Sequence, residues 1–336
     1  MQKQANKNLL VCLTPLQMLI ASKIIDQNPA SYDVLCLSYN ENKKYDYYFN
    51  NISKKCDLSW KFLVRSKSKI YRIFDFFRFK FFLLTLNRNK YNNVYLASID
   101  NPFLHILLSK LSKNNIATFD DGTANIYKES IYYNYQNKGR VQDLILALLG
   151  NIYNTQDVVS ESSKHYSIYN NYSNIIENVS FISLFNQKET VVEKEKEKEK
   201  EKEKEKEKEK EKEKEKEKVK IFLGQPFKDI KGINTEKILN FIESLKIDYY
   251  FPHPREVEKY NNFKYIDSSL IFEDYIVNIL KDGYFVEVYT LLSTAALNVA
   301  SLKNVRIKVL CEKDLNINYF QFYEIFKNID CDVINF

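Results

Sequence analysis

The sequence is poor in glycine, and this scarcity excludes the common phosphate-binding loops. It holds 6 glycines in 336 residues, about 1.8 per cent against an average of about 7 per cent. The two that lie nearest to each other, Gly224 and Gly232, are eight residues apart. A dinucleotide-binding fingerprint needs glycines two and three residues apart, and a Walker A loop needs a pair about five apart followed by Lys-Ser/Thr. Any nucleotide must therefore be bound by another kind of site.

Cysteine and catalytic motifs are also scarce. The five cysteines, at positions 12, 36, 56, 311 and 331, are odd in number, contain no C-x-x-C pair and lie mostly in apolar runs. This pattern favours reduced, buried thiols over a disulfide framework or a zinc site. No H-E-x-x-H or G-x-S-x-G motif occurs, which disfavours a metal enzyme or a serine hydrolase. We expect no bound metal.

Long apolar runs are absent, and the charge is uneven. No stretch of 18 uncharged apolar residues occurs, and Met1 to Asn8 lacks the apolar segment of a signal peptide, so we expect a cytoplasmic protein. The net charge is +6, yet residues 60–90 alone carry nine Lys or Arg and one acid, Asp75. This basic, Phe-rich stretch fits a surface for an anionic membrane or nucleic acid, or a buried helix with a solvated basic rim. We expect peripheral contact with the anionic inner membrane and no nucleic acid.

A Glu-Lys repeat of thirteen pairs, from Glu193 to Lys218, divides the chain. It has no apolar face to bury, so a solvated, extended or partly helical linker is expected. We predict domains at 1–190 and 219–336, joined by a linker over 191–218.

Both flanking segments alternate short apolar runs with helical patterns. Predicted strands are Leu9–Leu13, Val34–Leu37, Phe62–Val64, Val94–Ala97, Ala117–Asp120, Val219–Leu223, Tyr249–Phe251, Val286–Tyr289, Val305–Leu310 and Asp332–Ile334. Predicted helices are Gln17–Asp26, Asp75–Leu86, Phe103–Ser112, Thr235–Leu245, Phe272–Lys281 and Thr294–Ala300. This alternation predicts an α/β fold with parallel sheets and a cleft between two halves. In such sheets ligands bind at the carboxyl ends of the strands.

The first candidate site is the turn Asp120-Asp121-Gly122-Thr123, which directly follows a predicted strand. Adjacent carboxylates raise the pKa of one of them, which suits a general base. Alternatively, Asp120 or Asp121 caps the next helix or closes the turn. From the residues alone we expect one catalytic and one structural aspartate.

The second candidate is Pro252-His253-Pro254-Arg255, again at a strand end. The two prolines restrict the backbone and hold the imidazole in place, as a general acid or phosphate partner requires. The other two histidines have simpler interpretations: we expect His105, on an apolar helix, to be a satisfied core residue and His165 to serve only in packing.

The third candidate is Ser293-Thr294, where a strand gives way to a helix. Hydroxyls and free N–H groups at a helix N-terminus bind phosphate without a glycine-rich loop, although a plain N-cap gives the same pattern. Gly224-Gln225-Pro226 forms a fourth strand-end turn, with Asp229 close behind.

These segments resemble a known family. In the same order along nearly the whole chain, the similar segments are Thr14–Met18, Lys44–Phe49, Val94–Ser98, Thr118–Thr123, His165–Tyr166, Pro252–Arg255, Glu273–Ile276 and Tyr289–Leu297. Together they are similar to the bacterial lipooligosaccharide sialyltransferases of glycosyltransferase family 52. The resemblance implies a GT-B-like fold of two Rossmann-like domains with their parallel sheets facing a central cleft, and often a homodimer. It also implies inverting, metal-independent transfer of sialic acid from CMP-sialic acid to a terminal galactose, with no cofactor.

The resemblance also suggests roles for the candidates. In the family, an aspartate assigned as general base follows the turn that matches Gly224-Gln225-Pro226, and Phe227 stands there in this sequence. The base is therefore Asp121 or Asp229, and we favour Asp121. His253 would protonate or stabilise the leaving CMP phosphate, Ser293 and Thr294 would hold it, and Glu273 would bind ribose hydroxyls. Substrate binding is further assigned to Asp120, Gly122, Thr123, Gly224, Gln225, Pro254 and Arg255.

Two other functions remain compatible with these residues. One is the transfer of a different sugar from another sugar nucleotide, and the other is a non-enzymatic scaffold for polysaccharide assembly at a membrane surface. The linkage, which we expect to be α-2,3 rather than α-2,6, is not determined by the residues.

Overall fold

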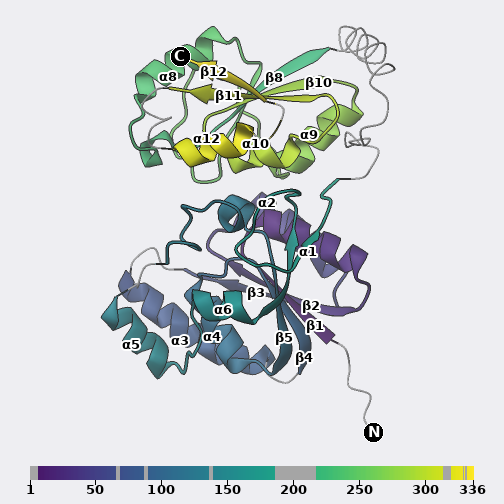
Figure 1. Cartoon of the computed structure of the whole chain (residues 1–336), viewed down its shortest axis with the longest axis vertical. Helices are drawn as coiled ribbons and strands as arrows, with labels where there is room; N and C mark the ends of the chain where they lie inside the picture. Colours follow the sequence, from purple (N-terminus) through teal and green to yellow (C-terminus); the bar gives the residue numbers. More distant parts are fainter. Residues whose placement is uncertain are drawn as a thin grey trace. The chain divides into compact units, whose positions relative to one another are not determined.

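The chain folds into two compact units, Met1–Leu184 and Phe185–Phe336, each built on its own parallel sheet (Figure 1). The computed structural model describes residues 7–65, 69–86, 90–135, 139–185, 217–312, 319–327, 329 and 331–336. The Glu-Lys repeat lies outside the described residues except for Glu217 and Lys218, as do residues 66–68 and 87–89 of the basic stretch.

The first unit is a seven-stranded parallel sheet with the order β3-β2-β1-β4-β5-β6-β7. Its strands are β1 (Lys7–Cys12), β2 (Ser31–Ser38), β3 (Leu58–Leu63), β4 (Tyr91–Leu96), β5 (Lys113–Phe119), β6 (Ser162–Ser167) and β7 (Val179–Phe181). Its helices are α1 (Pro15–Gln27), α2 (Lys43–Ser53), α3 (Lys69–Leu86), α4 (Pro102–Lys110), the 3-10 turn η1 (Gly122–Asn125), α5 (Arg140–Leu148) and α6 (Thr155–Glu161). Figure 1 shows α1 and α2 on one side of the sheet and α3 to α6 on the other.

The second unit is a five-stranded parallel sheet with the order β12-β11-β10-β8-β9. Its strands are β8 (Lys218–Leu223), β9 (Tyr249–Phe251), β10 (Phe285–Thr290), β11 (Val305–Cys311) and β12 (Cys331–Asn335). Its helices are the 3-10 turn η2 (Phe227–Asp229), α8 (Thr235–Ser244), α9 (Phe272–Lys281), α10 (Thr294–Val299) and α12 (Phe320–Lys327). In Figure 1, α9, α10 and α12 cover one side of this sheet and α8 lies on the other.

The strand orders define where each sheet can bind a ligand. In the first unit the chain moves outward from β1 to β2 and β3 and then returns to β4 on the other side of β1. In the second unit it moves from β8 to β9 and returns to β10. These are the two common orders of doubly wound sheets, and ligands bind at the carboxyl ends of the strands where the direction reverses. The switch points are β1/β4 and β8/β10.

The α/β fold class expected from the sequence is confirmed, and every predicted strand and helix overlaps an observed one. The elements that were not predicted include α2, α5, α6, α12, β6 and β7. Of these, β6 reads Ser-Ser-Lys-His-Tyr-Ser, without an apolar run, and nevertheless its last three residues are buried.

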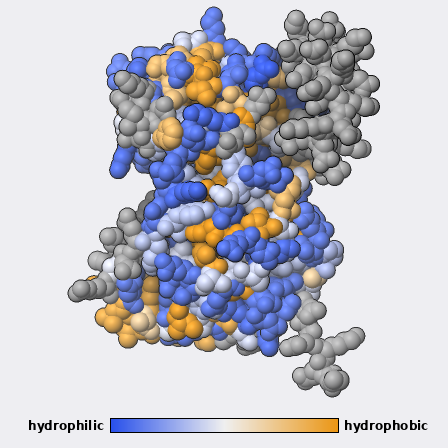
Figure 2. Space-filling model, viewed as in Figure 1, coloured by the Kyte–Doolittle hydropathy of each residue, from blue (hydrophilic) through white to orange (hydrophobic). Residues whose placement is uncertain are grey.

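Helix α3, which carries much of the basic stretch, is apolar on two sides. Its inner side packs Phe76, Phe79 and Leu83 into the core of the first unit, each at most 3 % exposed. Its outer side exposes Tyr71, Phe74, Phe77, Phe81 and Leu84, and α5 exposes Val141, Leu144 and Leu148. Figure 2 shows hydrophobic surface at the lower left of this unit, where Figure 1 places these two helices. The exposed rim of this partly buried helix is therefore apolar as well as basic. Among the described residues, no helix is both long and apolar enough to span a membrane.

Candidate active site

Asp121 lies beside the switch point of the first unit and is held by three side chains, of which Gln17 and Ser98 follow β1 and β4. It follows β5 and precedes η1, where Gly122 has a φ of +57° that allows the turn. Its Oδ1 accepts a hydrogen bond from Gln17 Nε2 at 2.7 Å. Its Oδ2 accepts from Ser98 Oγ at 2.7 Å and from Tyr132 OH at 3.1 Å. Its carboxylate makes no helix-capping bond, so the expectation that Asp121 only caps a helix is wrong.

Asp120 has a different environment although it is the next residue. Its side chain is fully buried, and it accepts hydrogen bonds from His165 Nε2 (2.9 Å), Ser167 Oγ (2.8 Å) and the Ile168 N–H (2.6 Å). His165 is also fully buried and its Nδ1 is 2.8 Å from Thr118 Oγ1. Asp120 therefore ties β6 to β5. The structure does not support a substrate contact for it, and His165 does more than pack.

The rest of this turn is also turned inward. Thr123 is 7 % exposed, and its carbonyl accepts hydrogen bonds from the N–H groups of Ile126 and Tyr127. His105 is the satisfied core histidine that the sequence predicted, because it is buried and its Nε2 lies 2.7 Å from the carbonyl of Ile99.

The switch point of the second unit joins two of the predicted turns. Gln225, 7 % exposed, accepts a hydrogen bond from the Leu292 N–H at 2.9 Å, so the turn after β8 is tied to the turn after β10. Ser293 occupies the N-cap position of α10, but its side chain makes no capping bond. A plain N-cap is therefore wrong for this hydroxyl. Ser293 and Thr294 are both partly exposed at this edge.

The His253 loop is held by a residue that sequence reasoning missed, Glu256. Glu256 Oε2 accepts from the His253 N–H at 3.1 Å, and its Oε1 accepts from Tyr250 OH at 2.5 Å. Burial raises the pKa of this carboxyl, although the two hydrogen bonds lower it. His253 Nδ1 accepts from the Arg255 N–H at 3.1 Å, so a neutral imidazole carries its proton on Nε2. The sequence signal for this contact is a carboxylate three residues after His253, close enough to accept a hydrogen bond from the backbone of the loop.

Gly224 is needed because other groups approach its backbone closely. A Cβ at this position would lie 2.4 Å from the Tyr250 ring and 2.6 Å from Glu256 Oε2. The loop that carries His253 therefore packs directly on the turn after β8. Pro254 and Arg255 are exposed on this loop.

The remaining predicted residues of this unit differ in exposure. Phe227 is 2 % exposed and packs against Phe222 and Tyr260, so the residue in the family's base position is part of the core. Asp229 is exposed at the end of η2. Glu273 is 3 % exposed on α9 and accepts from Asn298 Nδ2 of α10 at 2.7 Å, a contact between helices rather than an open ribose site.

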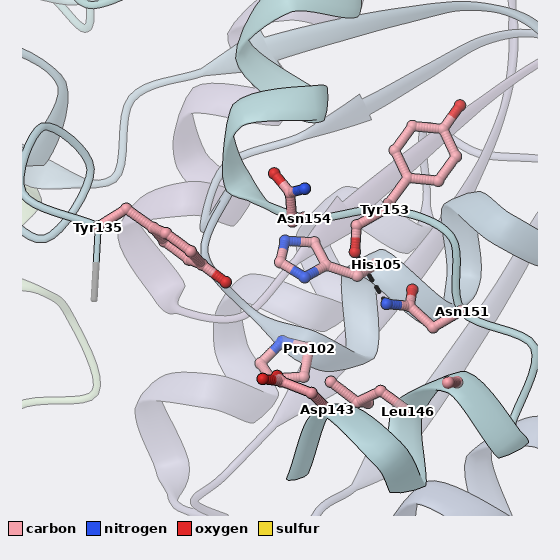
Figure 3. Close-up of a pocket in the computed structure, with 9 residues that line it drawn as sticks. Pro102, His105, Tyr135, Asp143, Leu146, Asn151, Tyr153 and Asn154 are labelled. Carbon is pink, nitrogen blue, oxygen red and sulfur yellow. Dashed lines mark hydrogen bonds between the residues drawn. The ribbon is translucent and has the colours of Figure 1, made fainter. Parts of the chain in front are cut away.

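A separate cavity lies away from these turns. It has a volume of about 130 Å³ and is lined by residues of α4, α5 and the loops around them, including His105, Tyr135, Asp143, Asn151 and Tyr153 (Figure 3). Ligand pockets commonly measure about 300–1,000 Å³, so this cavity is too small for a sugar nucleotide. None of the predicted site residues lines it. Within the described ranges, no cluster of three His, Cys, Asp or Glu side chains could hold a metal ion.

Comparison with known proteins places these residues in a family. A model of glycosyltransferase family 52 matches residues 31–314. The chain belongs to glycosyltransferase family 52. It is 32% identical over 333 residues to the CMP-N-acetylneuraminate:beta-galactoside alpha-2,3-sialyltransferase of Pasteurella multocida, covering 98% of this chain and 99% of the relative. It is 30% identical to the N-acetyllactosaminide alpha-2,3-sialyltransferase of Haemophilus influenzae, covering 90% and 91%.

Solved structures support the fold of this family 52 chain. Arabidopsis thaliana UGT89C1 complexed with UDP has a TM-score of 0.51 at 8% identity and covers 98% of this chain and 86% of its own. The UDP-GlcNAc 2-epimerase of Neisseria meningitidis bound to UDP-GlcNAc has a TM-score of 0.50 at 13% identity and covers 96% and 91%. At these identities the likeness shows the fold alone, and the GT-B-like expectation is confirmed.

Proposed function

We propose that this chain transfers sialic acid from CMP-sialic acid to a terminal galactose of a surface glycan such as lipooligosaccharide, forming an α-2,3 linkage with inversion and without a metal. The activities for which these relatives are named support the donor, the acceptor sugar and the linkage. One structural observation carries the proposal. Each sheet presents a polar, hydrogen-bonded turn at its switch point, Asp121 in the first unit and the Gln225–Leu292 pair in the second.

The first unit binds the acceptor in this proposal, and Asp121 acts as its general base. Three donors occupy three of the roughly four lone-pair positions of the Asp121 carboxylate. The remaining position accepts the proton of the galactose hydroxyl. The deprotonated oxygen attacks the anomeric carbon as the bond from that carbon to the CMP phosphate breaks, so one displacement inverts the configuration. A positioned base contributes about 10²–10⁴-fold to such a step.

The second unit binds the donor. The hydroxyls of Ser293 and Thr294 and the N–H groups at the start of α10 bind the CMP phosphate, and the turn that they share is fixed by Gln225. His253 donates a hydrogen bond from its Nε2–H to the leaving phosphate and stabilises its charge, because Arg255 and Glu256 hold the loop in a set orientation. Hydrogen-bond donors and fixed dipoles directed at a leaving phosphate perform the role that a metal performs elsewhere.

A direct assay tests the proposal. Purified protein is incubated with CMP-sialic acid and lactose, with and without EDTA, and the products are analysed by NMR. We expect α-2,3-sialyllactose and free CMP in equal amounts, at the same rate with EDTA. Absence of both products would overturn the donor assignment. If UDP rather than CMP raised the melting temperature of the protein, another sugar nucleotide would be the donor.

We also propose that α3 places the protein on an anionic membrane surface. The outer side of this helix combines exposed aromatic residues with the exposed cations Arg72 and Arg78. Apolar side chains that enter the acyl boundary together with cations at the headgroups are the requirements for interfacial binding. This contact would bring the enzyme to a lipid-linked acceptor.

A further inference from the structure

Gln17 contacts Asp121 from a distant part of the sequence. It lies in the first turn of α1, at the third helical position after the N-cap Thr14. Thr-x-x-Gln is a helix-capping pattern in which the glutamine side chain returns to a backbone N–H. Here Gln17 Oε1 accepts at 2.6 Å from the N–H of Leu13, the residue before the N-cap, in a variant of this pattern. This backbone contact uses only the amide oxygen of Gln17, so it does not explain the contacts of the NH₂ group.

The backbone contact determines how the amide is oriented. Because the Leu13 N–H can only donate, the atom facing it must be the amide oxygen, and the NH₂ group must face the other way. That group donates to Asp121 Oδ1 at 2.7 Å and to Ser98 Oγ at 3.0 Å. Since Ser98 Oγ accepts from Gln17, its own proton is directed to Asp121 Oδ2 at 2.7 Å. The amide of Gln17 and the hydroxyl of Ser98 therefore each direct one proton to the carboxylate.

We infer that Gln17, with Ser98, is a positioning residue that fixes the Asp121 carboxylate in one orientation for the acceptor hydroxyl. The inference rests on the proposed function of Asp121 and deepens it. Gln17 is fully buried and Ser98 is 6 % exposed, so their protons cannot turn to water instead. The contacts join β1, β4 and β5 at the switch point of the sheet.

The other titratable groups that face Asp121 do not compete with this role. Tyr45 on α2 and Tyr132 after η1 are electrostatically coupled to it, and burial raises the pKa of both phenols, so both are neutral at neutral pH. Asp120 faces His165 on β6 and is hydrogen-bonded there. Ser98 and Gln17 do not titrate.

The test measures transfer from CMP-sialic acid to lactose in the full-length variants Gln17→Met and Ser98→Ala. Each removes donors from the carboxylate without adding charge. We expect kcat to fall by about tenfold to a hundredfold, while the affinity for CMP stays at the wild-type value.

Controls separate this role from a structural one. Gln156→Met makes the same change on the exposed surface of α6 in the same unit and should leave kcat and the affinity for CMP unchanged. If Gln17→Met fails to fold, the smaller Ser98→Ala change still decides the question. A wild-type kcat in a folded variant, or an equal loss of kcat and of CMP affinity, would overturn the positioning role. A wild-type protein that transfers no sialic acid would instead overturn the proposed function.

Discussion

The two adjacent aspartates after β5 differ in what surrounds them, so we expect opposite effects from the same substitution. Asp120→Asn places an amide NH₂ among three buried donors, which should lower the free energy of unfolding by about 2–4 kcal/mol. Asp121→Asn lies in a partly exposed site and should cost less stability than Asp120→Asn, yet reduce kcat by at least about 100-fold. Urea unfolding and lactose sialylation, measured on the same preparations, check both.

Asp229→Asn is the matched control for the base. Asp229 is exposed at the end of η2, in the unit that carries the donor turns. We expect it to keep most of the wild-type kcat. If only this variant lost turnover while still binding CMP, Asp229 rather than Asp121 would be the base.

At the scale of elements, the outer side of α3 supports a prediction about vesicles. Phe74 and Phe81 are 64 % and 68 % exposed, so Phe74→Ser with Phe81→Ser removes apolar surface without disturbing the core. Affinity for phosphatidylglycerol vesicles in a sedimentation assay should fall at least about tenfold, because each buried aromatic side chain contributes about 1.5–3 kcal/mol. Phe320→Ser, an exposed aromatic on α12, should bind as wild type does. Equal binding by the double variant would place the contact elsewhere.

Glu287 on β10 couples three neighbouring strands and makes a pH-dependent contribution. Burial raises the pKa of this carboxyl. The ammonium groups of Lys308 (3.1 Å) and Lys218 (3.3 Å) and the Tyr289 hydroxyl lower it by more, so the pKa lies below its usual value. A group whose folded pKa is lowered stabilises the fold above its unfolded pKa and loses that contribution as the pH falls through the folded pKa.

Glu287→Gln should therefore lower the free energy of unfolding by about 1–2 kcal/mol at pH 7 and by clearly less at pH 4. Urea unfolding at the two pH values measures the difference. Glu236→Gln, on the exposed surface of α8, is the control and should differ from wild type by less than about 0.5 kcal/mol. A cost that is equal at both pH values would contradict the ion-pair explanation.

How far the sequence predicts these elements depends on where their stability comes from. A strand such as β1 is evident in the sequence because burial on both faces requires a continuous apolar run. Strand β6 is not, because its buried His165 and Ser167 are satisfied by Asp120, forty-five or more residues earlier. The strand-end turns could be predicted as well, because each directly follows an apolar run in the sequence. Their anchors, Gln17 and Glu256, were not, since each depends on contacts that only the folded sheet creates.

At the scale of the whole molecule, the two units offer separate probes of substrate binding. The single tryptophan, Trp60, lies on β3 and packs against the core of the first unit. Its fluorescence therefore reports the unfolding of that unit, whereas calorimetry reports both. The proposed phosphate-binding turns all belong to the second unit.

We expect CMP to stabilise the second unit selectively. A ligand that binds only the folded state at 100 times its Kd adds about 2.7 kcal/mol. A calorimetric scan with CMP should therefore move one transition to higher temperature, while the transition followed by Trp60 fluorescence stays in place. CMP-sialic acid should act in the same way, and lactose should not move the second unit's transition. If CMP instead raised the transition that Trp60 reports, the nucleotide would bind through the first unit, and the assignment of Ser293, Thr294 and His253 to the phosphate would be wrong.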